Sequence, residues 1–234
     1  MMAKKVCLIT GVGPGTGASL ARRFMRGGYQ IAMLARDKER LRELEGEIEH
    51  SKGFVCDVSD ETAVTNVVDS VVSELGQPEI LIHNAVGAVF GNFMEIAPAD
   101  LNSNFQTNVM GLCYLSRLLA PAMISAGRGA IIASGNTSAL RGKANFAGFA
   151  PTKAAQRIFA ESLARELGPK GIHVAYVLID AVIDLKWTRE WFPDKPDEYF
   201  IQPDDIAETT YQVAHQPRSA WSFNVEVRPF GESW

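Results

Sequence analysis

The chain has 234 residues, of which 47% are hydrophobic, a length and composition suited to one domain with a sizeable core. Its formal net charge is −4, and Lys and Arg are scattered along the sequence, so no basic footprint for nucleic acid is present. The three cysteines form no C-x-x-C pair and the four histidines are isolated, which argues against a disulfide framework and a metal site.

The start of the chain carries no targeting pattern. Only four apolar residues, 6–9, follow the N-terminal lysines, too few for the core of a signal peptide. No later run approaches the length of a membrane span. We therefore expect a cytoplasmic protein without a membrane partner.

Short apolar or β-branched runs alternate with stretches of helical period along the whole chain. The predicted strands are 6–9, 31–35, 54–56, 80–83, 130–133, 174–179 and 223–227. The predicted helices are 17–26, 38–49, 61–75, 100–126, 151–167 and 204–216. This alternation predicts an α/β fold, a single doubly wound Rossmann-like domain over residues 1–234 whose mostly parallel sheet has helices on both faces. Such sheets bind ligands beyond the carboxyl ends of their strands, so functional residues should follow the strands.

A glycine-rich turn, T-G-V-G-P-G-T-G, follows the first predicted strand and leads into the first predicted helix. Glycines there let backbone amides and the positive end of the helix approach an anion, and a pyrophosphate is the expected ligand. The spacing differs from the G-x-G-x-x-G fingerprint, and a simple tight turn is the alternative for the loop taken alone. The residues of this candidate site are Thr10, Gly11, Gly13, Pro14, Gly15, Thr16 and Gly17.

One irregular region, at about residues 180–202, follows the sixth predicted strand. It is rich in Trp, Phe, Pro and acidic residues, among them Trp187, Trp191 and Phe192. These aromatic side chains favour either a substrate loop that closes over a pocket or an ordinary packed loop.

Motifs after the other strands, taken with the glycine loop, resemble the short-chain dehydrogenase/reductase family over nearly the whole chain. Asp57 and Val58 are similar to the D-V pair that contacts the adenine, and Asn84 and Ala85 match part of the N-N-A-G motif, with Val86 in place of its glycine. The resemblance implies a Rossmann-like oxidoreductase that transfers a hydride between a nicotinamide cofactor and a small molecule.

The resemblance also gives roles to two residues elsewhere in the chain. Asn108 matches the asparagine that supports the active-site lysine through a water molecule. Ile183 follows the sixth predicted strand and, by resemblance, contacts the nicotinamide carboxamide through its backbone.

The choice of cofactor depends on the end of the second predicted strand. Arg36 stands there, and a guanidinium matches the 2′-phosphate of NADP(H) in charge and geometry. Asp37 follows directly and is the alternative, because an acidic residue pairs with the ribose of NAD(H). We expect NADP(H) rather than NAD(H).

The catalytic signature of the family, Y-x-x-x-K, is altered here. Lys153 keeps the lysine, which by resemblance also holds the nicotinamide ribose and so belongs to the expected cofactor-binding residues as well. Phe149 stands at the position of the tyrosine that normally donates a proton. Asn136 stands where the family has a serine, and its amide can still donate a hydrogen bond to a substrate oxygen. The enoyl-reductase branch places its tyrosine seven residues before the lysine, where this chain has Phe146. The predicted catalytic set is therefore Lys153, Asn108 and Asn136, without a tyrosine.

Two acidic residues of the irregular region, Asp180 and Asp184, are alternative proton sources, although exposed loop carboxylates or a helix cap are the commoner explanation for such residues. Without the tyrosine, the sequence favours substrates whose reduced form needs no strong local acid, such as quinones or conjugated enones. Two functions remain open: an NAD(P)(H)-dependent oxidoreductase with an altered proton route, and a catalytically impaired protein that senses NADP(H).

The predicted helix segment 112–126 is apolar on nearly every face, more than a half-exposed helix of a monomer should be. The resemblance implies that this helix and the one beginning at Pro151 pair across a dimer and that the closing strand supports a tetramer. We therefore expect a homodimer or homotetramer, or alternatively a helix buried within one subunit.

Overall fold

The computed structural model describes residues 5–231 of the chain. Its main sheet has seven strands in the order β3-β2-β1-β4-β5-β6-β9, and each neighbouring pair is parallel. The strands are β1 (Lys5–Thr10), β2 (Tyr29–Ala35), β3 (Ser51–Val55), β4 (Pro78–His83), β5 (Gly129–Asn136), β6 (Ile172–Ile179) and β9 (Asn224–Val227). The predicted Rossmann-like α/β fold with a parallel sheet is confirmed.

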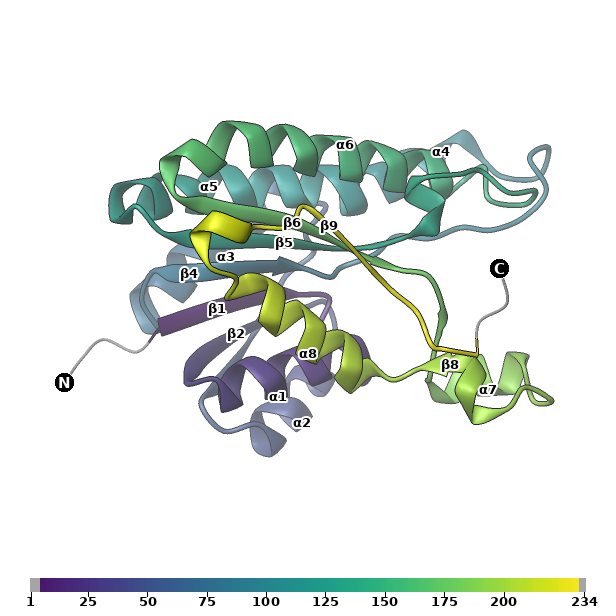
Figure 1. Cartoon of the computed structure of the whole chain (residues 1–234), viewed down its shortest axis with the longest axis horizontal. Helices are drawn as coiled ribbons and strands as arrows, with labels where there is room; N and C mark the ends of the chain where they lie inside the picture. The colour runs from purple at the N-terminus through teal and green to yellow at the C-terminus, as the bar shows by residue number, and fades with distance from the viewer. Residues whose placement is uncertain (1–4, 232–234) are drawn as a thin grey trace.

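Helices cover both faces of this sheet (Figure 1). One layer holds α3 (Glu61–Glu74), α5 (Gly111–Ala126) and α6 (Ala150–Leu167), and the other holds α1 (Thr16–Arg26), α2 (Lys38–Glu47) and α8 (Pro203–Ala214). Successive side chains of a strand point to opposite faces of the sheet. Leu8 belongs to the core under α3 and α5, and Ile9 belongs to the core under α1 and α8. From β1 the chain first adds strands on one side of the sheet, β2 and β3, and then crosses to the other side at β4. Ligands of such folds bind at this switch point, between β1 and β4.

The helix expected over residues 100–126 is longer than predicted and changes its winding. It begins as α4 (Pro98–Phe105), widens into a π-helical turn, η1 (Gln106–Met110), and continues as α5. Its length and apolar composition are sufficient for a membrane span, so the expectation that no run approaches one is wrong by that measure. Leu112, Leu115 and Leu119 are fully buried in the domain core, and the helix forms a layer of the fold.

The irregular region contains a small substructure that the sequence does not predict. Two short strands, β7 (Val182–Ile183) and β8 (Phe200–Ile201), pair in parallel, and α7 (Lys186–Trp191) lies between them. Short 3-10 turns occur at η2 (Thr137–Ala139), η3 (Gly168–Lys170), η4 (Asp197–Tyr199) and η5 (Arg218–Ala220). We refer to residues 180–202 as the α7 segment.

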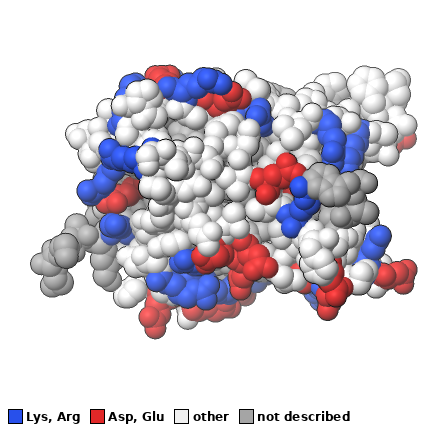
Figure 2. Space-filling model, viewed as in Figure 1, with Lys and Arg blue, Asp and Glu red and all other residues white. Residues whose placement is uncertain are grey.

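Charged side chains of both signs are interspersed around the face shown in Figure 2, and an uncharged area crosses its centre. No large cluster of one sign dominates this view of the described chain. This distribution agrees with the scattered Lys and Arg residues of the sequence.

Candidate active site

Two adjoining cavities at the carboxyl ends of the strands share Gly11 and Gly13. Of the predicted cofactor residues, the first cavity, of about 680 Å³, is lined by Gly11, Gly13, Pro14, Gly15, Thr16, Gly17, Asn84 and Ile183. The second, of about 580 Å³, is lined by Gly11, Gly13, Arg36, Asp57, Val58 and Ala85. Residues far apart in sequence thus meet along one edge of the sheet, where the switch in strand order opens a crevice.

The glycine loop requires glycine for two different reasons. Gly11 has a φ of +66°, and a Cβ there would lie 2.5 Å from the Ala85 Cα, so the loop after β4 packs directly on its backbone. A Cβ at Gly17 would lie 2.6 Å from the Gly11 carbonyl oxygen. At Gly13 a Cβ would meet nothing within 4 Å, so this glycine leaves space open beside the cavities. The open backbone before the N-terminus of α1 fits an anionic group such as a pyrophosphate.

Thr10 lies beneath the cavities rather than along them. Its buried hydroxyl accepts hydrogen bonds from the backbone amides of Asn84 and Ala85, each at 3.1 Å, and lies 3.2 Å from the Nδ1 of His83. The Asn84 Nδ2 donates to the Gly11 carbonyl at 3.1 Å. These bonds hold the loop after β4 against the glycine loop, so Thr10 positions residues that line the cavities.

His83, which the sequence analysis treated as isolated, is fully buried at the end of β4. Its Nε2 lies 3.1 Å from the Thr107 carbonyl. Burial, and secondarily the charge of Lys153, lower the pKa of His83 to about 3, so its ring is neutral at ordinary pH. The neutral ring bridges β1 to the π turn.

The second cavity brings Arg36, Asp37 and Asp57 together. Asp37 caps α2, because its Oδ1 accepts from the backbone amide of Arg40 at 3.0 Å. Burial alone would raise the pKa of Asp57, but hydrogen bonds from the side chain and amide of Ser59 and the charge of Arg36 lower it below its ordinary value. Arg36 is exposed at the cavity and Asp37 already has a structural role.

Asn108 is fully buried on the π turn, a widened helical turn of a kind that often occurs at functional sites. Its Oδ1 accepts from the Gly87 amide at 2.9 Å, and its Nδ2 donates to the Gly87 carbonyl and to the Thr152 Oγ1, both at 2.8 Å. A Cβ at Gly87 would lie 2.8 Å from the Asn104 Oδ1. Gly87, one position after the family glycine, therefore gives the loop its close approach to the helix.

Lys153 points into the protein interior from the first turns of α6. Its Nζ donates to the Ser134 carbonyl at 2.9 Å and to the Gln156 Oε1, and the side chain is 2% exposed. Burial lowers the pKa of Lys153 to about 7. The family resemblance implies a lysine that holds the nicotinamide ribose, but Lys153 is not among the residues that line either cavity, because its donors face interior acceptors.

Phe149 immediately precedes α6 and is buried in an aromatic cluster. Its ring centroid lies 5.1 Å from that of Phe90, which lies 5.0 Å from that of Phe146, and both pairs meet edge to face. Asn136 ends β5, and its Oδ1 accepts from the Ser138 amide at 3.1 Å, so it caps η2. The three phenylalanines thus form an apolar cluster just before α6.

The α7 segment lies over the glycine loop. The side chain of Leu185 is so close that a Cβ at Gly15 would lie 2.4 Å from its Cδ2. Trp187 lines the first cavity, whereas Trp191 packs edge to face on Trp187 and Phe192 contacts the ring of Tyr199. Of the three aromatic residues expected to close over a pocket, Trp187 is the one that lines the cavity.

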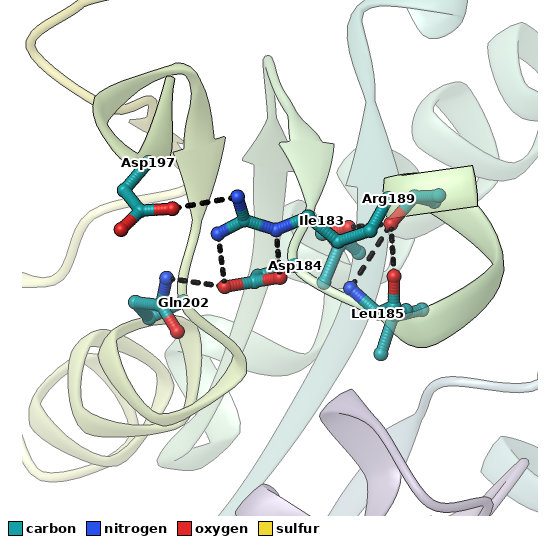
Figure 3. Close-up of polar contacts among 7 residues, drawn as sticks. Ile183, Asp184, Leu185, Arg189, Asp197 and Gln202 are labelled. Carbon is teal, nitrogen blue, oxygen red and sulfur yellow. Dashed lines mark hydrogen bonds and ion pairs between the residues drawn. The ribbon is translucent and has the colours of Figure 1, made fainter. Parts of the chain in front are cut away.

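One arginine ties the α7 segment together, as Figure 3 shows. The Arg189 guanidinium donates to both oxygens of Asp184, at 2.7 and 2.8 Å, and to Asp197 at 2.7 Å, while the Gln202 amide donates to Asp184 at 2.8 Å. The hydrogen bond from Arg189, assisted by Gln202, lowers the pKa of Asp184 to about 2. Asp184 is therefore a firmly ionised structural carboxylate, which contradicts its candidacy as a proton donor.

Asp180, the other candidate proton source, lies 3.8 Å from the Arg141 guanidinium. Within residues 5–231, no three His, Cys, Asp or Glu side chains gather as a group that could hold a metal ion.

Sequence reasoning missed Gln156, Leu185 and Phe90. Gln156 carries a usable signal, since a polar residue three positions after Lys153 falls on the same helical face. Leu185 and Phe90 carry none, because their contacts depend on how two loops fold over distant strands.

The sequence profile of the short chain dehydrogenase family matches residues 5–191. A 7alpha-hydroxysteroid dehydrogenase of Escherichia coli strain K12 is 28% identical over 229 residues, which cover 93% of this chain and 89% of the relative. A D-threitol dehydrogenase of Mycolicibacterium smegmatis is 27% identical over 215 residues, covering 87% and 83%.

Solved structures agree with this class. A metagenomic short-chain oxidoreductase in complex with NADP has a TM-score of 0.84 at 29% identity and covers 96% of this chain and 97% of its own. A 3-ketoacyl-(acyl-carrier-protein) reductase from Brucella melitensis complexed with NADH has a TM-score of 0.85 at 27% identity, covering 98% and 99%. Fold and site define a dinucleotide-binding α/β oxidoreductase class. The chain belongs to the short chain dehydrogenase family.

Proposed function

We propose that this protein is an NAD(P)(H)-dependent oxidoreductase that transfers a hydride to or from a small carbonyl, enone or quinone-like substrate. The glycine loop carries the proposal, because Gly11 and Gly17 allow close backbone packing while Gly13 leaves the cavity edge open for a pyrophosphate. The nicotinamide of a bound cofactor would supply or accept the hydride. The residues that would hold the cofactor line the two adjoining cavities.

We favour NADP(H) as the cofactor. The Asp37 carboxylate is occupied as the cap of α2, and the Arg36 guanidinium is exposed at the second cavity. A guanidinium can bind a phosphate through two parallel hydrogen bonds. The related structure that holds NADP supports this choice, whereas another relative holds NADH.

The proton route in this proposal does not use a tyrosine. Phe149, at the position of the family tyrosine, has no proton to donate, and the low pKa of Asp184 keeps its carboxyl ionised. The Asn136 amide can still donate a hydrogen bond to a substrate oxygen. Reduction of a quinone or conjugated enone leaves a stabilised, weakly basic anion that can take its proton from water, so these substrate classes fit best.

The experiment is a titration of purified protein with NADPH and NADH, followed by a substrate screen. Trp187 lines the first cavity, so bound nucleotide should change tryptophan fluorescence. Tight NADPH binding together with turnover of quinones or enones supports the proposal. Binding without turnover of any carbonyl class supports an NADP(H) sensor, a role favoured by the inward-facing Lys153 and the apolar Phe149. Absence of binding to either nucleotide contradicts both functions.

We further propose that the protein acts in the cytoplasm as a homodimer or homotetramer. Leu118 and Ile124 on α5 and Ile158 on α6 are exposed apolar side chains in the same helical layer. Burial of these side chains against a second copy would remove apolar surface from water.

A further inference from the structure

Two long polar side chains on α6, Lys153 and Gln156, are fully enclosed by the protein. Gln156 is 0% exposed and Lys153 is 2% exposed, although neither residue type is ordinarily buried without partners. They are three positions apart and therefore lie on one face of the helix. That face is turned toward the sheet and the π turn.

The Gln156 carboxamide joins Lys153 to the π turn. Its Oε1 accepts a hydrogen bond from the Lys153 Nζ, and its Nε2 donates to the Asn108 carbonyl at 2.7 Å. The orientation of the carboxamide is fixed chemically, because a backbone carbonyl can only accept: Nε2 must face the Asn108 carbonyl, which leaves Oε1 for the Lys153 Nζ. A hydrocarbon side chain of the same size could make neither contact.

A buried tyrosine on β6 supports this carboxamide. The Tyr176 hydroxyl lies 3.4 Å from the Gln156 Oε1 and 3.4 Å from the Lys153 carbonyl. A Cβ at Gly135 would lie 1.9 Å from the Tyr176 ring, so the glycine makes room for it. The bridge is thus enclosed by β5, β6, α6 and the π turn.

The position of the bridge bears on the candidate active site. Both recorded acceptors of the Lys153 Nζ, the Ser134 carbonyl and Gln156, lie in the interior, and neither residue lines the two cavities. We propose that Gln156 is a positioning residue that ties the Lys153 ammonium to the Asn108 carbonyl and keeps it withdrawn from bound nucleotide. The part that concerns the nucleotide rests on the proposed function.

The first test measures how accessible Lys153 is, without any nucleotide. An amine-reactive reagent labels the folded protein, and peptide mass spectrometry follows Lys153 in the unaltered chain, Gln156→Met and Gln156→Glu. Gln156→Met keeps the size of the side chain and removes both hydrogen bonds, so labelling should accelerate at least about tenfold. Gln156→Glu keeps an acceptor for Nζ but has no donor for the Asn108 carbonyl, so its labelling rate should lie between those of the unaltered chain and Gln156→Met.

The control is Gln212→Leu, at an exposed position of α8, which should leave labelling of Lys153 unchanged. Circular dichroism identifies variants that fold, and Gln156→Leu replaces Gln156→Met if the latter does not. Labelling of folded Gln156→Met or Gln156→Leu at the original rate overturns the bridge.

The second test uses NADPH. In Gln156→Met the released ammonium can reach the nucleotide, so the Kd for NADPH should fall at least about threefold, and Lys153→Met in the same chain should abolish that change. If Gln156→Met changes the Kd for NADPH equally in chains with Lys153 and with Lys153→Met, the positioning role of Gln156 is overturned. If the unaltered protein binds no NADPH, the proposed function fails, while the labelling experiment still decides whether the bridge holds Lys153.

Discussion

The rings of Phe149 and Phe90 meet edge to face with their centroids 5.1 Å apart and an angle of 64° between their planes. This contact buries Phe149 beside the first turn of α6, four residues before Lys153. An apolar group thus fills the position at which the family resemblance implies a proton donor. Several consequences of this site and of its surroundings can be measured.

Phe149→Tyr should introduce a general acid. We expect kcat/KM for simple ketones to rise by about 100-fold, because positioned acids contribute about 10²- to 10⁴-fold, while quinone rates change by less than about threefold. Steady-state kinetics with NADPH measures both. Phe90→Tyr, in the same aromatic cluster, is the matched control and should not reproduce the gain. Unchanged rates on every ketone and quinone in Phe149→Tyr would contradict the altered proton route.

Arg36→Ala should weaken the binding of NADPH but not that of NADH. Loss of a charge-assisted contact to the 2′-phosphate should raise the Kd for NADPH by about 10- to 100-fold and leave the Kd for NADH within about twofold. Fluorescence titration with both nucleotides provides the comparison. Arg42→Ala, an exposed arginine on α2, should change neither value. If Arg36→Ala weakened the binding of NADPH and NADH equally, Arg36 would not determine the preference for NADPH.

Two glycines of one loop should respond differently to alanine. Gly11→Ala forces a side chain onto a left-handed backbone and against Ala85, so the free energy of unfolding should fall by about 2 kcal/mol or more. Gly13→Ala meets no neighbour and should unfold close to the original urea midpoint, while its methyl group obstructs the cavity edge and weakens NADPH at least about tenfold. Tight NADPH binding by Gly13→Ala would exclude this loop from the nucleotide site.

Asp184→Asn should loosen the α7 segment in a pH-dependent manner. The folded-state pKa of Asp184, about 2, lies below its ordinary value of 3.8, so its stabilising contribution is complete above 3.8 and is lost as the pH falls toward 2. At neutral pH, amide exchange in residues 182–201 should be at least about threefold faster in the variant.

The difference between the variant and the original chain should shrink as the pH is lowered below 4. Asp194→Asn, an exposed carboxylate of the same segment, is the control and should exchange as the original chain does. A difference between Asp184→Asn and the original chain that stays constant down to acidic pH would show that the carboxylate is not its source.

Ile158→Glu should prevent association of subunits if α6 forms the proposed interface. Ile158 is 57% exposed, and a buried, unpaired carboxylate at that position would be unfavourable. Size-exclusion chromatography with light scattering should change from an oligomer to a monomer. Val72→Glu, on α3, provides the control and should leave the mass unchanged. A monomeric original chain would contradict the proposed assembly directly.

Much of the fold was predictable because its signals are local. Strand-like runs, helical periods and the glycine turn recur in the order that a parallel sheet requires, and six predicted helices and seven predicted strands have counterparts in the structure. The π turn around Asn108 was not predictable, since residues 106–110 contain neither Gly nor Pro to mark a change of winding within the helix. The same holds for α7, whose stability depends on contacts of Arg189 rather than on periodicity.

Most of the candidate cofactor residues do line the two cavities, but the sequence does not predict how individual side chains are oriented. The sequence places Lys153 on a helix after β5, but the direction of its Nζ depends on acceptors contributed by Ser134 and Gln156. Likewise, the sequence alone allows Asp184 to act as an acid. The structure shows that the Arg189 guanidinium, five positions later, donates to both of its carboxylate oxygens. The partners of a side chain determine its protonation state and the direction in which it points. Those partners are set by tertiary packing, and the spacing of residues in the sequence does not reveal them.

The hydrogen bonds centred on Arg189 connect residues no more than 18 positions apart, and none of them crosses into the seven-stranded sheet. The ends of the segment are tied to the main fold, because the Asp180 amide donates to the Val227 carbonyl of β9 at 2.9 Å and Ile201 is buried in the core under α1 and α8. We therefore expect movement only between these two anchors, in the part where Leu185 rests on Gly15. Displacement of that part would uncover the glycine loop while both anchors stay in place, which separates the lifetime of a bound ligand from the global stability of the protein.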